Sequence, residues 1–239
     1  MALQQVSFAA AEGQITAVIG PNGAGKTTLF NCITGMYRPS GGHVGFGGRD
    51  ITGALPHTVA RAGIARTFQN LALFPGLSVL DNLKVGAYRH GGSGLLAGAL
   101  FARRARREEA AAEHAARALL AFLDLADVAA ARPGELPYGR QKQVEFARAL
   151  MQGARMVLLD EPMAGMSGPE KEAMVAQIRN VRARLGVSFL LVEHDMPVIM
   201  DVSDRIVVLD FGRKIADGAP ASVARDPAVI AAYLGTESN

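Results

Sequence analysis

A glycine-rich segment at residues 20–28 constrains this chain more than any other feature, because it fits the pattern G-x-x-x-x-G-K-[ST]. An apolar run at residues 15–19 precedes it, and a helical pattern follows at residues 27–36. Glycines let backbone N–H groups surround an anion, and a helix start directs more N–H groups at it. The segment therefore predicts a site for the phosphates of a nucleoside triphosphate. Its expected residues are Gly20, Pro21, Asn22, Gly23, Ala24, Gly25, Lys26, Thr27 and Thr28.

Two side chains of this segment have expected chemistry of their own. Lys26 is positioned to reach the β- and γ-phosphates, and the hydroxyl of Thr27 is the expected ligand of Mg²⁺. A GTPase or small-molecule kinase that shares only this loop is a competing interpretation. A GTPase needs a guanine-reading Asn/Thr-Lys-x-Asp motif, and none of the five lysines is followed two residues later by Asp.

The composition describes an ordinary globular chain with an apolar core. Of 239 residues, 49% are hydrophobic and 20% charged, and the net charge of +3 falls short of the clustered basic surface of a nucleic-acid binder. Cys32 is the single cysteine, which excludes a disulfide within the chain and indicates a reducing compartment. The N-terminus lacks a signal-peptide pattern, and no apolar run approaches the ~18–20 residues that span a bilayer. We therefore expect a cytosolic protein whose membrane role, if it has one, is peripheral.

Strand and helix patterns alternate along the chain, which predicts an α/β fold with a mostly parallel sheet and helices on both faces. A hairpin around Phe211 and Gly212 predicts a small antiparallel part. We expect one domain over residues 1–239, with a helical subdomain inserted at residues 70–153. Capping boxes predict helix starts at Ser78 and at Ser167.

Acidic residues follow the buried strand pattern at residues 156–159. Asp160 and Glu161 would lie at the carboxyl end of that strand, where open α/β sheets bind ligands. We expect Asp160 to anchor Mg²⁺, through water, and Glu161 to take a proton from the attacking water. The alternative is a surface Asp-Glu pair, which the upstream phosphate loop disfavours.

Two weaker candidates follow other strands. His194 comes just after the strand pattern at residues 187–192, where it could bond the γ-phosphate or orient the water and Glu161. A solvated, ion-paired histidine is the plainer interpretation of that residue taken alone. Gln69 follows a strand after the phosphate loop and could contact Mg²⁺ or water.

The segment Leu-Pro-Tyr-Gly-Arg-Gln at residues 136–141 opens a helix expected at residues 141–151. Glycine at a helix start offers N–H groups to an anion. Because the phosphate loop already holds this chain's own nucleotide, a second anion site would serve the nucleotide of a partner subunit.

The order and spacing of these motifs resemble the ATP-binding subunit of ABC transporters over essentially the whole chain. The resemblance implies an ATP hydrolase of the P-loop type that uses ATP and Mg²⁺. It makes residues 20–28 the Walker A loop, and residues 164–167 the D-loop. It implies catalytic roles for Glu161, His194 and Gln69, and metal roles for Thr27, Gln69 and Asp160. The signature residues that it implies for the partner's nucleotide are Tyr138, Gly139, Arg140 and Gln141.

The Tyr-Gly-Arg-Gln form of the signature, the long insert and residues 204–212 look most similar to the subunit of branched-chain amino acid importers. That resemblance implies a second ATPase subunit, identical or related, two transmembrane permease subunits and, indirectly, a periplasmic binding protein. It implies a location at the cytoplasmic face of the inner (plasma) membrane and no nucleic-acid partner. Urea or amide import, lipopolysaccharide export, and an ABC ATPase that acts on DNA or the ribosome are the alternatives.

Three departures from the family pattern affect these expectations. Pro137 stands where many members have a Ser that touches the partner's γ-phosphate, and Ser167 stands where an Asp is usual. An aromatic residue that stacks on adenine usually precedes the first strand in this family, and this chain starts too late to carry it. Either adenine is held more weakly here, or the natural start lies upstream of Met1.

Overall fold

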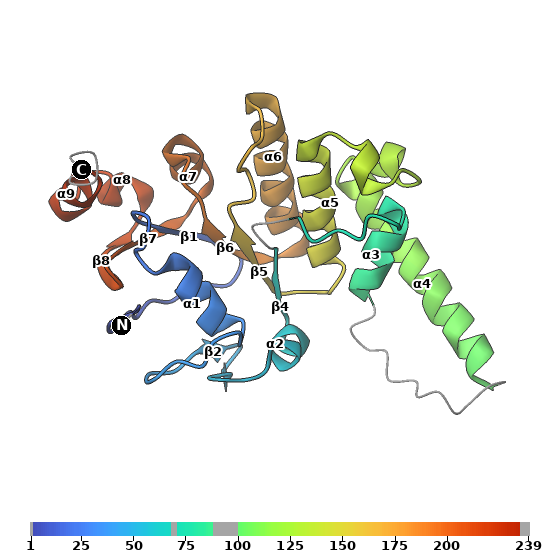
Figure 1. The fold of residues 1–239 in the computed structure, drawn as a ribbon, viewed down its shortest axis with the longest axis horizontal. Coiled ribbons are helices and arrows are strands. Elements are labelled where there is room, and N and C mark those ends of the chain that lie inside the picture. Colours follow the sequence, from blue (N-terminus) through green and yellow to red (C-terminus); the bar gives the residue numbers. More distant parts are fainter. Residues whose placement is uncertain (1, 68–70, 88–99, 235–239) are drawn as a thin grey trace.

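A six-stranded sheet organises the protein, in the order β4-β5-β6-β1-β7-β8 (Figure 1). The computed structural model describes residues 2–67, 71–87 and 100–234, with the side chains of 100–105 and 234 excluded. Five strands run parallel, and β8 pairs antiparallel with β7, as the hairpin predicts. A separate antiparallel pair joins β2 and β3. The strands are β1 (Ile15–Ile19), β2 (Gly45–Phe46), β3 (Arg49–Asp50), β4 (Ile64–Arg66), β5 (Met156–Asp160), β6 (Ser188–Val192), β7 (Arg205–Asp210) and β8 (Arg213–Gly218).

Helices cover both faces of this sheet, which confirms the predicted α/β class. They are α1 (Lys26–Ile33), α2 (Pro56–Ala62), α3 (Val79–Ala87), α4 (Leu100–Phe122), α5 (Tyr138–Leu150), α6 (Gly168–Leu185), α7 (Met196–Val202), α8 (Pro220–Val223) and α9 (Pro227–Leu234). The predicted helix starts at Ser78 and Ser167 are confirmed, and Ser167 forms the full capping box with Glu170. The backbone N–H of Asp81 donates to Ser78 Oγ at 3.0 Å, and that of Ser167 donates to Glu170 Oε2 at 2.8 Å.

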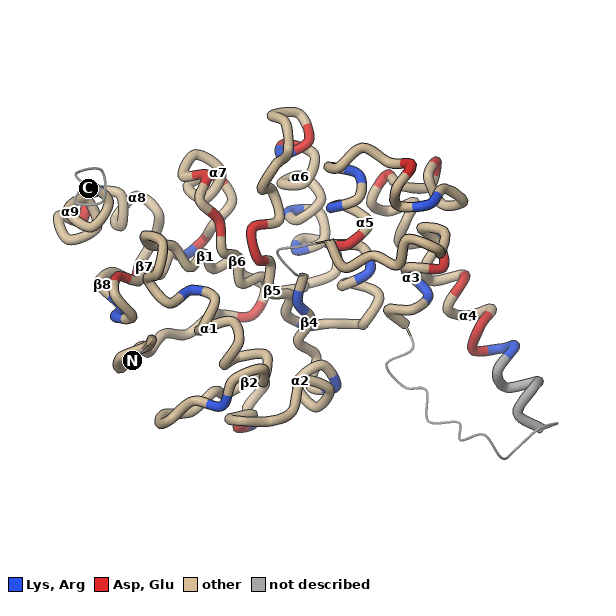
Figure 2. The backbone as a smooth tube through the Cα atoms, viewed as in Figure 1, with Lys and Arg blue, Asp and Glu red and all other residues tan. Residues whose placement is uncertain are grey.

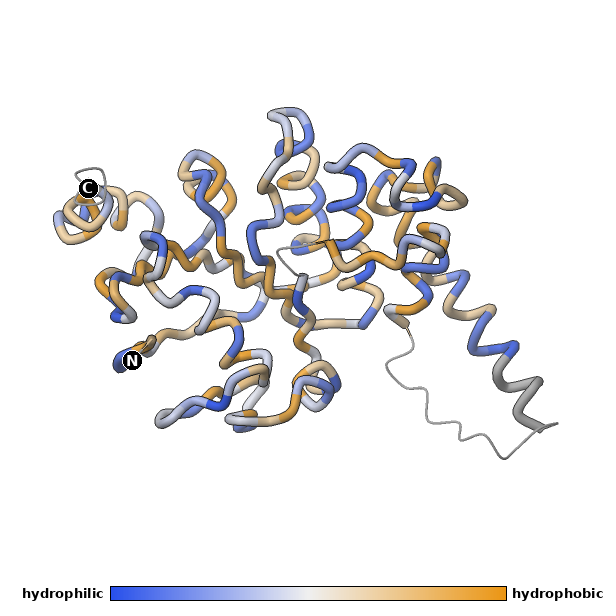
Figure 3. The backbone as a smooth tube through the Cα atoms, viewed as in Figure 1, coloured by the Kyte–Doolittle hydropathy of each residue, from blue (hydrophilic) through white to orange (hydrophobic). Residues whose placement is uncertain are grey.

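The alternation of side chains along the strands divides the core into layers. In β5, Val157 and Leu159 pack with α3, α4, α5 and α6 on one face. Leu158 between them packs with α1 and α2 on the other face. Figure 3 shows the resulting apolar strands at the centre of the molecule. The helix that follows the phosphate loop and the helix that begins with the signature therefore lie on opposite faces of the sheet.

The chain between β4 and β5 contains helices and no strand in its described part. Helix α3 packs against α4 and α5, and these helices extend to one side of the sheet (Figure 1). Their buried side chains belong to the same apolar cluster as residues of β5 and β6. The inserted subdomain with bounds 70–153 stays a prediction. No helix in the described ranges is long and apolar enough to cross a membrane.

Candidate active site

The phosphate loop joins β1 to α1 in a backbone conformation that depends on glycine. Gly20 has a φ of 148°, and a Cβ there would lie 2.0 Å from the carbonyl oxygen of Leu209. Gly25, with a φ of 102°, is the N-cap of α1, and no side chain caps that helix start. The first N–H groups of α1 and the partial positive charge of its N-terminus therefore face the loop.

Lys26 is the first residue of α1, and its side chain is almost fully buried within the loop. Its Nζ donates to the carbonyl oxygens of Gly20 at 2.6 Å and Pro21 at 3.0 Å. Burial lowers the pKa of the Lys26 ammonium, and the nearby carboxylates of Glu161 and Asp160 oppose that shift. The structure therefore brings the loop lysine, Asp160 at the end of β5 and Glu161 after it into one electrostatic environment.

Strand order explains this convergence. Strand β6 lies between β1 and β5, and all three are parallel. Their carboxyl ends therefore meet at one edge, which carries the phosphate loop after β1, Asp160 and Glu161 at the end of β5, and His194 after β6.

Asp160 is the last residue of β5 and is 5% exposed. Its Oδ2 accepts a hydrogen bond of 2.7 Å from Nη2 of Arg66, the last residue of β4. The backbone N–H of Asp160 lies 3.4 Å from Thr67 Oγ1. Arg66 and Thr67 were not among the residues singled out from the sequence.

Glu161 and His194 form a direct pair. The Nε2 of His194 lies 2.9 Å from Oε1 of Glu161, and the two side chains are 47% and 21% exposed. Glu161 adopts a φ of 49°, which is uncommon for a residue with a Cβ, and its N–H donates to the carbonyl of Val192 at 2.9 Å. The backbone after β5 is thus turned so that the Glu161 carboxylate faces the end of β6.

Glu193 holds the backbone on both sides of the Glu161–His194 pair, and it was not singled out from the sequence. It is 5% exposed, and its Oε1 accepts from the N–H of Met163 at 2.8 Å. Its Oε2 accepts from the N–H of His194 at 3.0 Å. One buried carboxylate therefore joins the loop after β5 to the loop after β6. The only signal in the sequence was an acidic residue next to the candidate histidine.

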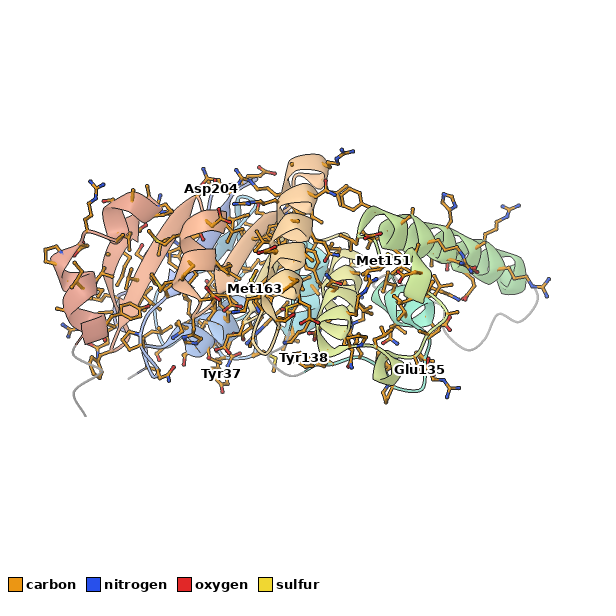
Figure 4. The ribbon with its side chains drawn as sticks, turned by 90° about the horizontal axis from the view of Figure 1, so that it is seen from above. Tyr37, Glu135, Tyr138, Met151, Met163 and Asp204 are labelled. Carbon is orange, nitrogen blue, oxygen red and sulfur yellow. The ribbon has the colours of Figure 1, made fainter. Side chains whose placement is uncertain are left out.

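The signature residues occupy the first turn of α5, which begins at Tyr138 rather than at Gln141 as the sequence predicted. Pro137 is the N-cap, and Gln141 Nε2 donates to the carbonyl of Leu136 at 2.9 Å. A Cβ at Gly139 would lie 2.3 Å from Oε1 of Glu170 in α6. Seen from above, Tyr138 lies at the rim of the molecule and Met163 in its interior (Figure 4).

Arg140, the remaining signature residue, bonds residues of its own chain. Arg140 Nη2 lies 3.0 Å from Asp127 Oδ2, and Nη1 donates to the carbonyl of Asp124 at 2.7 Å. These contacts of the signature are with Leu136, α6 and residues 124–127. The structure does not bring it to the phosphate loop of the same chain.

The donors at this edge suit a hard cation. Thr27 is exposed at the start of α1, and Asp160 presents a carboxylate at the end of β5. Hydroxyl and carboxylate oxygens are ligands that Mg²⁺ accepts, together with phosphate oxygens and water. Gln69, the third expected donor, lies outside the described residues.

Comparisons with known proteins agree with this arrangement. The ABC transporter family matches residues 3–164, and a branched-chain amino acid ATP-binding cassette transporter family matches residues 213–238. The high-affinity branched-chain amino acid transport ATP-binding protein BraF of Pseudomonas aeruginosa is 42% identical over 98% of this chain and 92% of its own length. The corresponding LivG protein of Escherichia coli is 37% identical over the same shares.

Solved structures show the same fold. A nucleotide-free ATP-binding cassette from an ABC transporter matches with a TM-score of 0.84 and 34% identity, over 97% of this chain and 92% of that one. The ADP conformation of an ATP-binding cassette matches with a TM-score of 0.83 and 33% identity, over 98% and 92%. The chain therefore belongs to the ABC transporter family, as one of its nucleotide-binding, ATP-hydrolysing subunits.

Proposed function

We propose that this chain hydrolyses ATP to power an importer of branched-chain amino acids, through nucleotide-driven dimerisation and reopening. The pairing of Glu161 with His194 at 2.9 Å, beside the buried Lys26, carries the hydrolytic part. The names of the full-length relatives support the transport part.

In this proposal the loop residues 20–28 hold the ATP phosphates through backbone N–H groups and Lys26. Thr27, Gln69 and Asp160 would hold Mg²⁺, which when bound neutralises charge on the phosphate oxygens. Glu161 accepts a proton from the attacking water. His194 fixes the Glu161 carboxylate by bonding Oε1, and Glu193 fixes the backbone of His194.

Dimerisation follows from where the signature lies. The helix that it begins, α5, packs on the face opposite to α1, and α5 contacts the edge strand β4. Strand β4 is three strand spacings from β1, or roughly 14 Å. We infer that Tyr138, Gly139, Arg140 and Gln141 meet the nucleotide of a second ATPase subunit, which is a copy of this chain or a related chain.

The apolar segment at residues 71–77 is the proposed contact with the permeases. Phe74 and Leu77 are 47% and 36% exposed. Hydrogen bonds from two helices hold the segment. Asn82 Oδ1 accepts from the N–H of Phe74 at 2.8 Å, and Arg148 of the signature helix donates to the carbonyl of Ala72 at 2.5 Å. Because Arg148 belongs to α5, a displacement of residues 71–77 would be transmitted to α5.

This arrangement implies the remaining partners. We propose two transmembrane permease subunits, with a periplasmic binding protein acting through them and no nucleic acid. The chain would then lie at the cytoplasmic face of the inner membrane, held there by the permeases.

A photocrosslinker at Phe74 is expected to capture a permease subunit in membranes that contain the assembled transporter, because this side chain is apolar and exposed. The same group at Leu185, which is 53% exposed at the end of α6, is the matched control. Capture from position 185 and not from position 74 would contradict the proposal that residues 71–77 contact the permeases.

Uptake tests the proposed substrate. A strain that lacks this chain is expected to lose high-affinity uptake of radiolabelled leucine, isoleucine and valine, and to regain it with the wild-type chain. Urea and acetamide uptake are measured in parallel. Loss of urea or amide uptake with normal leucine uptake would favour the alternative importers. Unchanged uptake of all of these solutes would contradict the importer proposal.

A further inference from the structure

The ion pair between Arg66 and Asp160 lies inside the proposed metal site and is almost fully buried. The side chains are 11% and 7% exposed. Arg66 is paired in register with Leu158, so Asp160 is two residues further along β5 and on the same face of the sheet. Figure 2 shows basic and acidic residues along the backbone, with both kinds in the region of β4 and β5. The long arginine side chain bridges this diagonal to reach Oδ2 at 2.7 Å.

Contacts with α1 also fix the guanidinium. Its Nη1 donates to Asn31 Oδ1 at 2.6 Å, and its Cζ lies 5.5 Å from the ring centroid of Phe30. Asn31 and Phe30 belong to α1, the helix that starts at Lys26. A planar guanidinium held by two strands and a helix has a defined orientation, which a flexible ammonium would not have.

The pair determines how many oxygens Asp160 can offer to a cation. The carboxylate has two oxygens, and Arg66 bonds Oδ2. Oδ1 has no hydrogen-bond partner among the described residues. In this position Arg66 occupies one acceptor site of Oδ2, and Oδ1 is the oxygen left for a cation or its water. An unheld carboxylate can rotate and bind through both.

We infer that Arg66 is a positioning residue that makes this site select Mg²⁺ over Ca²⁺, an inference that rests on the proposed nucleotide function. Mg²⁺ requires a near-ideal octahedron with single oxygens. Ca²⁺ takes six to eight oxygens and accepts a bidentate carboxylate. By holding Oδ2, Arg66 denies Ca²⁺ the second oxygen while leaving Mg²⁺ the one that it needs.

The test measures metal preference and not turnover. With a non-hydrolysable ATP analogue at fixed concentration, Mg²⁺ or Ca²⁺ is titrated and the rise in melting temperature of the chain is followed. The ratio of the two half-saturating concentrations is compared between variants. The affinity of the analogue for each ion in solution is common to all variants and cancels in this comparison.

Arg66→Met is expected to shift the ratio toward Ca²⁺ by about fivefold or more, since ligand count and site rigidity set Ca²⁺ affinity. Arg155→Met is the matched control, because Arg155 also stacks on an aromatic ring, 5.0 Å from the centroid of Phe46, without contacting Asp160. If Arg66→Met does not fold, Arg66→Lys keeps a cation beside the carboxylate. Without the planar fork it is expected to shift the ratio in the same direction, by about two- to threefold.

Equal weakening of both metals in a folded Arg66 variant would overturn the inference and leave Arg66 as a counter-charge only. A ratio that shifts as much in Arg155→Met would also overturn it. Failure of the wild-type chain to be stabilised by the analogue with either metal would instead contradict the proposed nucleotide function.

Discussion

A Glu161→Gln variant is expected to bind ATP and to hydrolyse it about 10²- to 10⁴-fold more slowly than the wild-type chain, the range for loss of a positioned general base. Glutamine keeps the shape of the side chain and can still bond His194, which lies 2.9 Å from Oε1. It cannot accept the proton of the attacking water. Phosphate release from the permease-bound complex measures this loss. Because hydrolysis reopens the dimer in the proposed cycle, size-exclusion chromatography with ATP should find this variant dimeric.

Glu172→Gln provides the control, since Glu172 is an exposed residue of α6 outside the candidate site. Its turnover should match that of the wild-type chain. Unchanged turnover in Glu161→Gln would mean that another group is the base. A variant that stays monomeric with ATP and the permeases present would contradict the dimer-based cycle.

Lys26→Ala is expected to lose ATP binding, and this is the second large effect. Removal of a buried cation that contacts a charged ligand costs about 2–5 kcal/mol, or roughly a 30- to 5,000-fold loss of affinity. Lys26 is 7% exposed and bonds backbone carbonyls of the loop, so bound phosphate would replace these carbonyls as its partner. Equilibrium binding of a fluorescent ATP analogue measures the change.

Lys84→Ala is the control, because it shows whether removal of any buried, ion-paired lysine lowers the affinity for ATP. Lys84 is also largely buried and paired with Asp81 and Glu109, on α3 and α4. This variant is expected to be less stable and to bind ATP normally. If Lys26→Ala bound ATP within a few-fold of the wild-type affinity, the assignment of the phosphate site would be wrong.

Some features of the protein depend only on neighbours in the sequence, and these were predicted well. The capping boxes at Ser78 and Ser167 each join residues three apart. Lys26 bonds the carbonyls of Gly20 and Pro21, which are only six and five residues away. Such contacts form wherever the segment is placed, so the motif alone is informative.

The start of α5 shows where local signals fail. Proline and glycine at positions 137 and 139 disfavour a helix, and the sequence predicted its start at Gln141. In the structure α5 starts at Tyr138, and Gly139 packs so closely on the side chain of Glu170 in α6 that a Cβ would lie 2.3 Å from Oε1. This packing involves a residue 31 positions away, which no pattern within the helix can reveal.

The sequence by itself determined the fold class, the phosphate loop and the acidic residues after β5, because a strand, a turn and a helix start are specified by residues close together. Only the tertiary structure decided that Arg66 holds Asp160, that Glu193 holds Met163, and that the signature lies away from its own phosphate loop. The first two contacts span 94 and 30 residues. They exist because burial of the apolar faces pairs β5 with β4 on one side and with β6 on the other, although several helices separate β4 from β5 along the chain.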